Sequence, residues 1–210
     1  MNKNEHEKTN FDVKAATWDD DPKRIKRAGE IADTIIRDAR PTREMDAMDF
    51  GCGSGLITLH LQPLVKSITG VDSSQKMLNV LEKKVKERGL ANVRTRLYDV
   101  EAIESIEGAY HLIVSSMTLH HVANPGALLK RLNGLLHPGG YLGIADIDTE
   151  DGTFHPDNTG VQHFGFDRVE LKQLFTGAGF SDLRDTTAAT VVREEEKRTY
   201  TVFLISGKKH

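Results

Sequence analysis

The sequence lacks several features that would place it in particular classes of protein. A single cysteine, Cys52, among 210 residues excludes an internal disulfide framework and fits a reducing compartment. No run of about 18 apolar residues is present, so no spanning helix is expected, and the polar N-terminus is not expected to be a secretory signal. A formal net charge of −3 gives no general attraction to nucleic acid or to an anionic membrane. We therefore expect a cytoplasmic protein, monomeric or homodimeric, whose partners include neither nucleic acid nor membrane.

What is present is enough sequence for one substantial domain. The content of 38% hydrophobic and 28% charged residues suits a globular protein, and a chain of 210 residues can bury a large core. We expect one globular unit, with an N-terminal arm and capping helix in residues 1–40 and the main domain in residues 41–210.

A glycine-rich loop follows the first predicted strand. Residues 48–55 read Met-Asp-Phe-Gly-Cys-Gly-Ser-Gly, and a helix is expected to begin at Leu56. A strand, a glycine turn and a helix N-terminus form a site for a nucleotide or anionic ligand. Gly51 and Gly53 fit the dinucleotide fingerprint G-x-G-x-x-G, but its third glycine falls on Leu56, and a glycine stands at Gly55 instead. The lysine of a phosphate-binding G-x-x-x-x-G-K-[ST] loop is missing.

A second stretch supports a specific family. Residues 111–116 form a predicted strand, residues 119–122 read Leu-His-His-Val, a leucine-striped helix follows, and residues 137–140 read His-Pro-Gly-Gly before another strand. Together with the Asp-x-Gly-x-Gly-x-Gly loop, this run resembles the class I S-adenosylmethionine (SAM)-dependent methyltransferases. The resemblance covers roughly residues 10–206 and is weakest at both ends and in residues 148–165.

Strands and helices alternate along the chain, which predicts an α/β fold with a doubly wound, mostly parallel sheet and helices on both faces. Seven strands are expected, and the resemblance implies that the last two form an antiparallel C-terminal edge hairpin. The predicted strands cover residues 45–50, 67–72, 93–98, 111–116, 141–147, 180–192 and 200–206, and long helices cover residues 22–39 and 75–88.

The resemblance implies that SAM is the cofactor. A carboxylate beside the loop, Asp49, suits the cationic amino acid of SAM, and Asp72, which ends the second strand, is placed to bind ribose hydroxyls, with a helix N-cap as its alternative role. Met77 is a candidate for packing on adenine or in the core, and the cysteine of the loop is expected to pack rather than act as a nucleophile. The expected cofactor-binding residues are Asp49, Gly51, Cys52, Gly53, Gly55, Asp72, Ser73, Met77, Asp99, Val100 and Ser116.

The acceptor side is expected to involve an N-terminal segment and four histidines. Family members carry a segment similar to the one that contains Phe11 and Trp18, which the resemblance implies folds over cofactor and substrate; docking of the arm by Trp18 is the alternative. The candidate general bases are His120, His121, His155 and His163, because the pKa of histidine suits proton transfer near neutrality. Of these, His120, His155 and His163 are also candidate substrate contacts, while the resemblance implies that one histidine of the 119–122 run is structural.

The acceptor is predicted to be a small organic molecule. The Asn/Asp-Pro-Pro-aromatic motif of nucleobase methyltransferases is absent after the fourth strand, as are the carboxylates of the metal-dependent catechol type. No H-x-x-x-H or C-x-x-C spacing is present, so no metal is expected. The sequence therefore predicts methyl transfer from SAM to a small molecule by in-line displacement. The alternatives are a non-catalytic protein that binds SAM or S-adenosylhomocysteine (SAH), and a nicotinamide-dependent oxidoreductase, which Leu56 disfavours.

Overall fold

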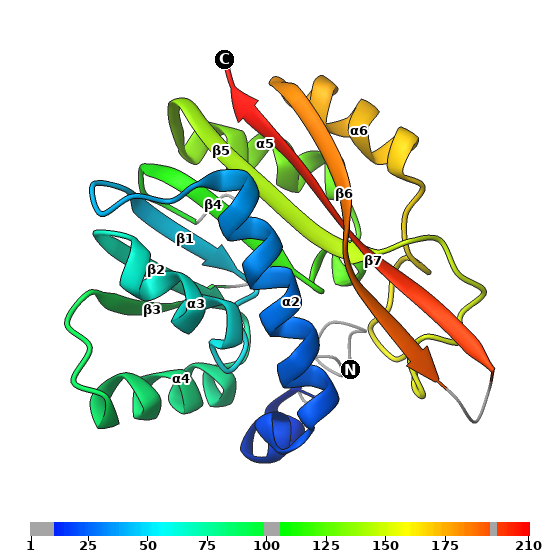
Figure 1. The fold of residues 1–210 in the computed structure, drawn as a ribbon, viewed down its shortest axis with the longest axis horizontal. Helices are drawn as coiled ribbons and strands as arrows, with labels where there is room; N and C mark the ends of the chain where they lie inside the picture. The colour runs from blue at the N-terminus through cyan, green and yellow to red at the C-terminus, as the bar shows by residue number, and fades with distance from the viewer. Residues whose placement is uncertain (1–10, 99–105, 194–196) are drawn as a thin grey trace.

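The computed structural model describes residues 11–98, 106–193 and 197–210. At its centre lies a seven-stranded sheet in the order β3-β2-β1-β4-β5-β7-β6 (Figure 1). Strands β1 to β5 run parallel to one another, and β7 lies antiparallel between β5 and β6. The strands are β1 Asp46–Phe50, β2 Ser67–Asp72, β3 Val93–Leu97, β4 Tyr110–Ser116, β5 Leu136–Ile147, β6 Phe180–Arg193 and β7 Arg198–Lys209. The predicted mostly parallel sheet with its antiparallel C-terminal hairpin is confirmed.

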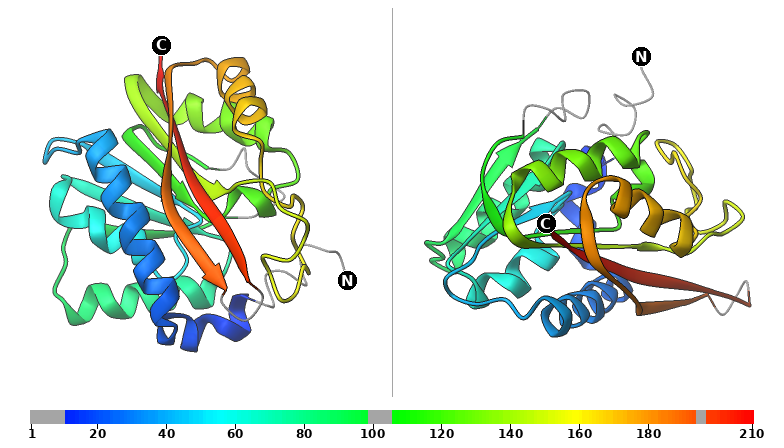
Figure 2. Two further views of the ribbon diagram at one scale, coloured as in Figure 1. Left: turned by 45° about the vertical axis from the view of Figure 1, so that its right-hand side comes forward. Right: turned by 90° about the horizontal axis from the view of Figure 1, so that it is seen from above.

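Helices cover both faces of this sheet (Figure 2). One face packs against α2 Pro22–Ala39, α3 Leu56–Leu61 and α4 Gln75–Glu87, and the other against α5 Pro125–Leu135 and α6 Arg168–Gly177. Alternation along β1 shows why: Ala47 joins the first core, whereas Met48 and Phe50 join the second. Helix α2 contributes Ile31 and Ile35 to the first core, so the expected capping helix packs directly on the sheet.

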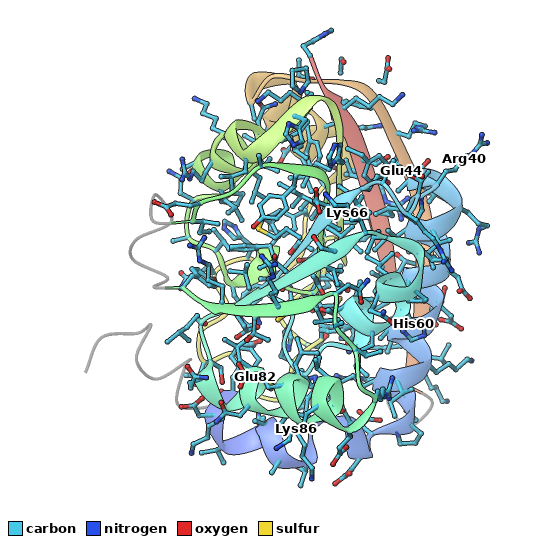
Figure 3. The ribbon with its side chains drawn as sticks, turned by 90° about the vertical axis from the view of Figure 1, so that its left-hand side faces the viewer. Arg40, Glu44, His60, Lys66, Glu82 and Lys86 are labelled. Carbon is cyan, nitrogen blue, oxygen red and sulfur yellow. The ribbon has the colours of Figure 1, made fainter. Side chains whose placement is uncertain are left out.

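Local capping sets where the helices begin. The side chain of Asp21 accepts hydrogen bonds from the first turn of α2, and Pro22 occupies the first helical position. Ser74 caps α4 and Asp167 caps α6 in the same manner. On the outer side of the sheet, Glu82 and Lys86 extend from α4 (Figure 3), and Thr95 of β3 donates a hydrogen bond to Glu82.

Strand β5 begins earlier than expected. It starts at Leu136 rather than at residue 141, so the predicted turn at residues 137–140 belongs to the strand. The pairing of β4 with β5 shifts register between Tyr110 and Leu112, and Gly139 has a φ of 75°. The proline and glycines therefore form an irregular first part of the strand rather than a turn before it.

The connections that follow the parallel strands meet at one edge of the sheet. The 3-10 turn η4 Leu119–His121 follows β4, and the segment of residues 148–165 follows β5. The backbone N–H groups of Gln162 and His163 both donate to the carbonyl of His120, at 2.9 and 3.1 Å, and an isolated bridge joins Asp148 to Phe166. The segment is thereby fixed against η4. Within the described ranges, no helix is both long and apolar enough to cross a membrane.

Candidate functional site

The glycine loop between β1 and α3 is fixed to the end of β2. The N–H groups of Gly51 and Cys52 donate to the carbonyl of Val71, at 2.8 and 3.1 Å. The N–H of Gly53 donates to the carboxylate of Asp72 at 2.8 Å, and the N–H of Ser74 donates to the other oxygen of that carboxylate, also at 2.8 Å. The loop therefore has one defined conformation before any ligand binds.

The three glycines of the loop are needed for three different reasons, although all have positive φ values. At Gly51 a Cβ atom would lie 2.2 Å from Oγ1 of Thr118, and at Gly55 it would lie 2.3 Å from a methyl group of Leu81. At Gly53 a Cβ atom would meet nothing within 4 Å. Gly51 and Gly55 thus allow close packing within the protein, whereas Gly53 borders open space that a ligand can fill.

Two carboxylates flank this loop, the buried Asp49 and the half-buried Asp72. Asp49 is 1% exposed and accepts a hydrogen bond of 2.6 Å from the hydroxyl of Thr58. Burial raises its pKa to about 7, and the nearby carboxylate of Asp72 adds to the rise. Burial also raises the pKa of Asp72, although the N–H groups of Ser74 and Gly53 oppose that rise. A cation bound between these carboxylates would relieve their unfavourable environment.

Both carboxylates open into a cavity at the carboxyl ends of β1, β2 and β4, which the glycine loop, the start of α4 and the N-terminal arm border. Most of the predicted site residues line it: Phe11, Trp18, Asp49, Gly51, Cys52, Gly53, Asp72, Ser73, Met77, Ser116 and His121. Gly55 is not among the lining residues because it faces Leu81. Asp99 and Val100 lie outside the described residues.

The N-terminal arm is attached to the same loop. The hydroxyl of Ser54 donates to Asp19 and that of Ser74 donates to Asp12, both at 2.6 Å. Lys84 of α4 joins the first of these contacts by pairing with Asp19. These bonds fix the arm over the cavity, where the ring of Phe11 lies against that of Trp18, with centroids 5.7 Å apart.

The four candidate histidines occupy different positions. His121 lines the cavity, and its ring lies edge-on to Phe11 with centroids 5.3 Å apart. His120 is 1% exposed and its Nδ1 lies 2.7 Å from the carboxylate of Asp146. Nε2 of His155 lies 3.1 Å from Nε2 of His120. His163 bonds through its Nε2 to the carbonyl of Val122 at 3.0 Å and does not line the cavity.

The surroundings keep His155 neutral and Asp146 ionised. Burial and, to a smaller extent, the neighbouring His120 and His121 together lower the pKa of His155 to about 3. Burial would raise the pKa of Asp146, but His120 and two backbone N–H groups outweigh that effect and hold it below its usual value. The cluster therefore combines a buried carboxylate with an uncharged imidazole near neutral pH.

Several lining residues were not anticipated from the sequence. Arg24 and Arg27 of α2 line the cavity, as do Tyr98 and Thr118. Tyr98 directly follows β3, so its place at a strand end was a usable signal. For the two arginines no signal existed, because helical periodicity shows which face is polar but not what that face meets.

Comparison with known proteins identifies relatives of this chain. A family model described as a methyltransferase domain matches residues 24–184. An uncharacterized methyltransferase of Schizosaccharomyces pombe is 34% identical over 154 residues, which cover 66% of this chain and 54% of that protein. A ubiquinone biosynthesis O-methyltransferase of Parvibaculum lavamentivorans is 29% identical over 112 residues, or 53% of this chain and 44% of that protein. The chain thus spans about half the length of these curated relatives.

A solved structure shares the fold. The crystal structure of a SAM-dependent methyltransferase from Aquifex aeolicus superposes with a TM-score of 0.68 at 20% sequence identity. The match covers 95% of this chain and 98% of that one. The described sheet and helices therefore correspond to a complete Rossmann-like methyltransferase fold.

The open space at Gly53 leads to a first prediction. Gly53→Ala should weaken binding of SAM by at least about tenfold, because the added methyl group enters the ligand's space. Gly89→Ala is the matched control, since Gly89 also has a positive φ and open surroundings but ends α4 outside the cavity. Both variants should lose about 1–2 kcal/mol of stability from backbone strain. Calorimetric titration and urea unfolding measure the two effects, and equal affinities in both variants would contradict this placement of the ligand.

Proposed function

The chain belongs to the methyltransferase-domain family, and we propose that it is an enzyme that methylates a small organic acceptor with SAM as the donor. The observation that carries this proposal is the pairing of two carboxylates, the buried Asp49 and the half-buried Asp72, with an open glycine loop at one end of the cavity. The carboxylate of Asp49 beside the loop would attract the cationic amino acid of SAM and would disfavour a dinucleotide pyrophosphate in the same place.

The residues of the cavity fit SAM part by part. The amino group would lie near Asp49 and the loop, where open space at Gly53 leaves room for the ligand. The carboxylate of Asp72 would accept hydrogen bonds from the ribose hydroxyls. Met77, which is 1% exposed yet lines the cavity, and Tyr98 offer apolar and aromatic surface for the adenine.

When bound, SAM supplies an electrophilic methyl group: its transfer breaks the carbon–sulfur bond, leaves the electron pair on sulfur in SAH, and releases the proton of the acceptor. The protein has to align the acceptor and exclude water. Phe11 and Trp18 would serve the second purpose, because the arm that carries them is fixed across the cavity by the Asp12 and Asp19 hydrogen bonds.

The acceptor is proposed to carry a negative charge and to be methylated on oxygen. The half-buried guanidinium of Arg27 lines the cavity and makes no hydrogen bond or ion pair within the described part of the chain. Burial lowers its pKa, and Arg24 lowers it further, so an anion would stabilise it. His121 adds a polar ring on this side. The name of the O-methyltransferase relative supports oxygen as the acceptor atom.

The function is tested by calorimetric titration of the purified protein with SAM, SAH and NADH. Micromolar affinity for SAM and SAH, with none for NADH, is expected. Methyl transfer is then measured as SAH formed in the presence of candidate acceptors. Binding of NADH without binding of SAM would overturn the proposal, and tight SAH binding without any product across acceptor classes would instead favour a non-catalytic module.

Affinity for SAM should depend on pH through Asp49. In the free protein its pKa is about 7, and a bound ammonium group would lower that value, so binding releases a proton wherever Asp49 starts protonated. Affinity should therefore rise about fivefold between pH 6 and pH 7, rise by about another factor of two to pH 8, and level off above pH 8. Calorimetry in buffers of different ionisation enthalpy counts the protons released.

Two controls separate Asp49 from Asp72 in this experiment. Asp49→Asn should remove the rise in affinity between pH 6 and pH 7. Methylthioadenosine, which keeps the ribose but lacks the amino acid, should bind with little pH dependence in this range. A similar rise for methylthioadenosine would assign the titration to Asp72 and contradict the role given to Asp49.

Arg27 should determine the charge preference of the acceptor site. We expect the protein to methylate 3,4-dihydroxybenzoate in preference to the matched 3,4-dihydroxybenzamide. Arg27→Gln should reduce kcat/KM for the acid about 10- to 100-fold, the scale of a charged hydrogen bond, without changing SAM affinity. Arg37→Gln on the same helix is the control, because Arg37 bonds to Thr34 and does not line the cavity. Equal use of acid and amide by the unmodified protein would refute this role.

A further inference from the structure

Three histidines come together beside the acceptor side of the cavity. His120 and His121 belong to η4, and His155 comes from the segment after β5. One ring nitrogen from each lies within 4.8 Å of the others. We propose that these histidines bind a divalent transition-metal ion of the zinc type, for which imidazole nitrogen is a preferred ligand.

The distance between two of the nitrogens already fits a shared metal ion. Nε2 of His120 and Nε2 of His155 are 3.1 Å apart. With metal–nitrogen bonds of about 2.0–2.1 Å, neighbouring ligands lie roughly 2.9 Å apart in an octahedron and 3.3 Å apart in a tetrahedron. The third nitrogen, from His121, lies within 4.8 Å of these two and would have to move closer to share the ion.

The outer hydrogen bonds of the cluster orient lone pairs inward. The buried carboxylate of Asp146 accepts from Nδ1 of His120, so a neutral His120 carries its lone pair on Nε2, toward His155. The carbonyl of Gly160 lies 3.3 Å from Nδ1 of His121 and accepts a hydrogen bond from its N–H, so that a neutral His121 also carries its lone pair on Nε2. A carboxylate or carbonyl behind each ligating imidazole is the usual second shell of a metal site.

The backbone around His155 is fixed independently of any ion. The guanidinium of Arg193 donates to the carbonyls of Thr153 and Phe154, and the ring of Phe154 is 4% exposed. The N–H groups of Thr153 and Phe154 both donate to the carboxylate of Glu150. The backbone of His155 is therefore held in place, which reduces the conformational entropy lost on metal binding.

The proposed ion would face the cavity. His121 is a lining residue while His120 is buried behind it, so coordination positions beyond the three histidines open toward the acceptor side. Three protein ligands with an open position are typical of a catalytic rather than a structural metal site. This part of the inference rests on the proposed function: the ion would bind the acceptor oxygen and favour its deprotonated form, and Arg27 would bind the remaining negative charge.

Metal binding is tested on untagged protein after treatment with a chelator. Titration with Co²⁺, followed by calorimetry and visible absorption, should show one equivalent bound with micromolar or tighter affinity. His155→Ala should weaken binding at least 50-fold, and Asp146→Asn about 10- to 100-fold. His137→Ala is the matched control, because His137 pairs with His111 elsewhere in the sheet and should leave Co²⁺ binding unchanged. Addition of azide should alter the absorption spectrum if a coordination position is open.

The same samples are titrated with SAH to separate the two proposals. SAH binding without Co²⁺ binding would overturn the metal site and leave the methyltransferase assignment standing. Co²⁺ binding without SAH binding would support the metal site and contradict the cofactor. Co²⁺ binding that survives His155→Ala would overturn the metal site. Loss of Co²⁺ binding in His137→Ala would overturn it as well. The stoichiometry of the unmodified protein is measured alongside and does not depend on the stability of either variant.

Discussion

The placement of the buried Asp49 beside the half-buried Asp72 is the constraint on which the site depends. Raising the pKa of Asp49 from 3.8 to about 7 corresponds to roughly 4 kcal/mol of unfavourable ionisation free energy. The fold accepts this because Thr58, Gly53 and Ser74 donate hydrogen bonds to the two carboxylates. Those bonds also fix the glycine loop to the end of β2. The hydrogen bonds that offset the cost of desolvating the carboxylates thus also shape the space that the carboxylates face.

The cavity combines two kinds of charge. Carboxylates lie within β1 and at the end of β2, whereas the cationic Arg27 comes from α2 and the polar ring of His121 from the turn after β4. SAM, with its cationic amino acid, would interact favourably with the carboxylates, and an anionic acceptor bound beside it would interact favourably with Arg27 and His121. The N-terminal arm is held over the cavity by two hydrogen bonds. Asp19 accepts one from Ser54 in the glycine loop, and Asp12 accepts one from Ser74, which caps α4.

Sequence patterns predicted the parts of this structure that local chemistry determines. The alternation of strands and helices gave the sheet, and caps such as Asp21 and Ser74 marked where helices begin. The end of β2 placed Asp72 beside the loop because parallel strands direct their carboxyl ends to one edge. The glycine spacing indicated a ligand loop, but only the packing of Thr118 and Leu81 shows that Gly51 and Gly55 serve the protein while Gly53 borders the cavity.

Contacts between distant segments were beyond such patterns. His155 lies 35 residues along the chain from His120. The expectation of no metal rested on the missing H-x-x-x-H and C-x-x-C spacings, which say nothing about histidines that the fold brings together from separate segments. The segment is brought back by backbone hydrogen bonds from Gln162 and His163, which any residue type could make. His163 was a candidate base because of its position in this segment. Its side chain forms a hydrogen bond with the carbonyl of Val122 and does not line the cavity. The start of β5 at Leu136 similarly depends on pairing with β4.

A crystal structure of the protein with SAH tests the central claim most directly. The account predicts the amino group within about 3 Å of Asp49 or the glycine loop, the ribose hydroxyls on Asp72, and the sulfur directed toward His121. Ribose electron density away from Asp72, or SAH bound outside this cavity, would contradict it.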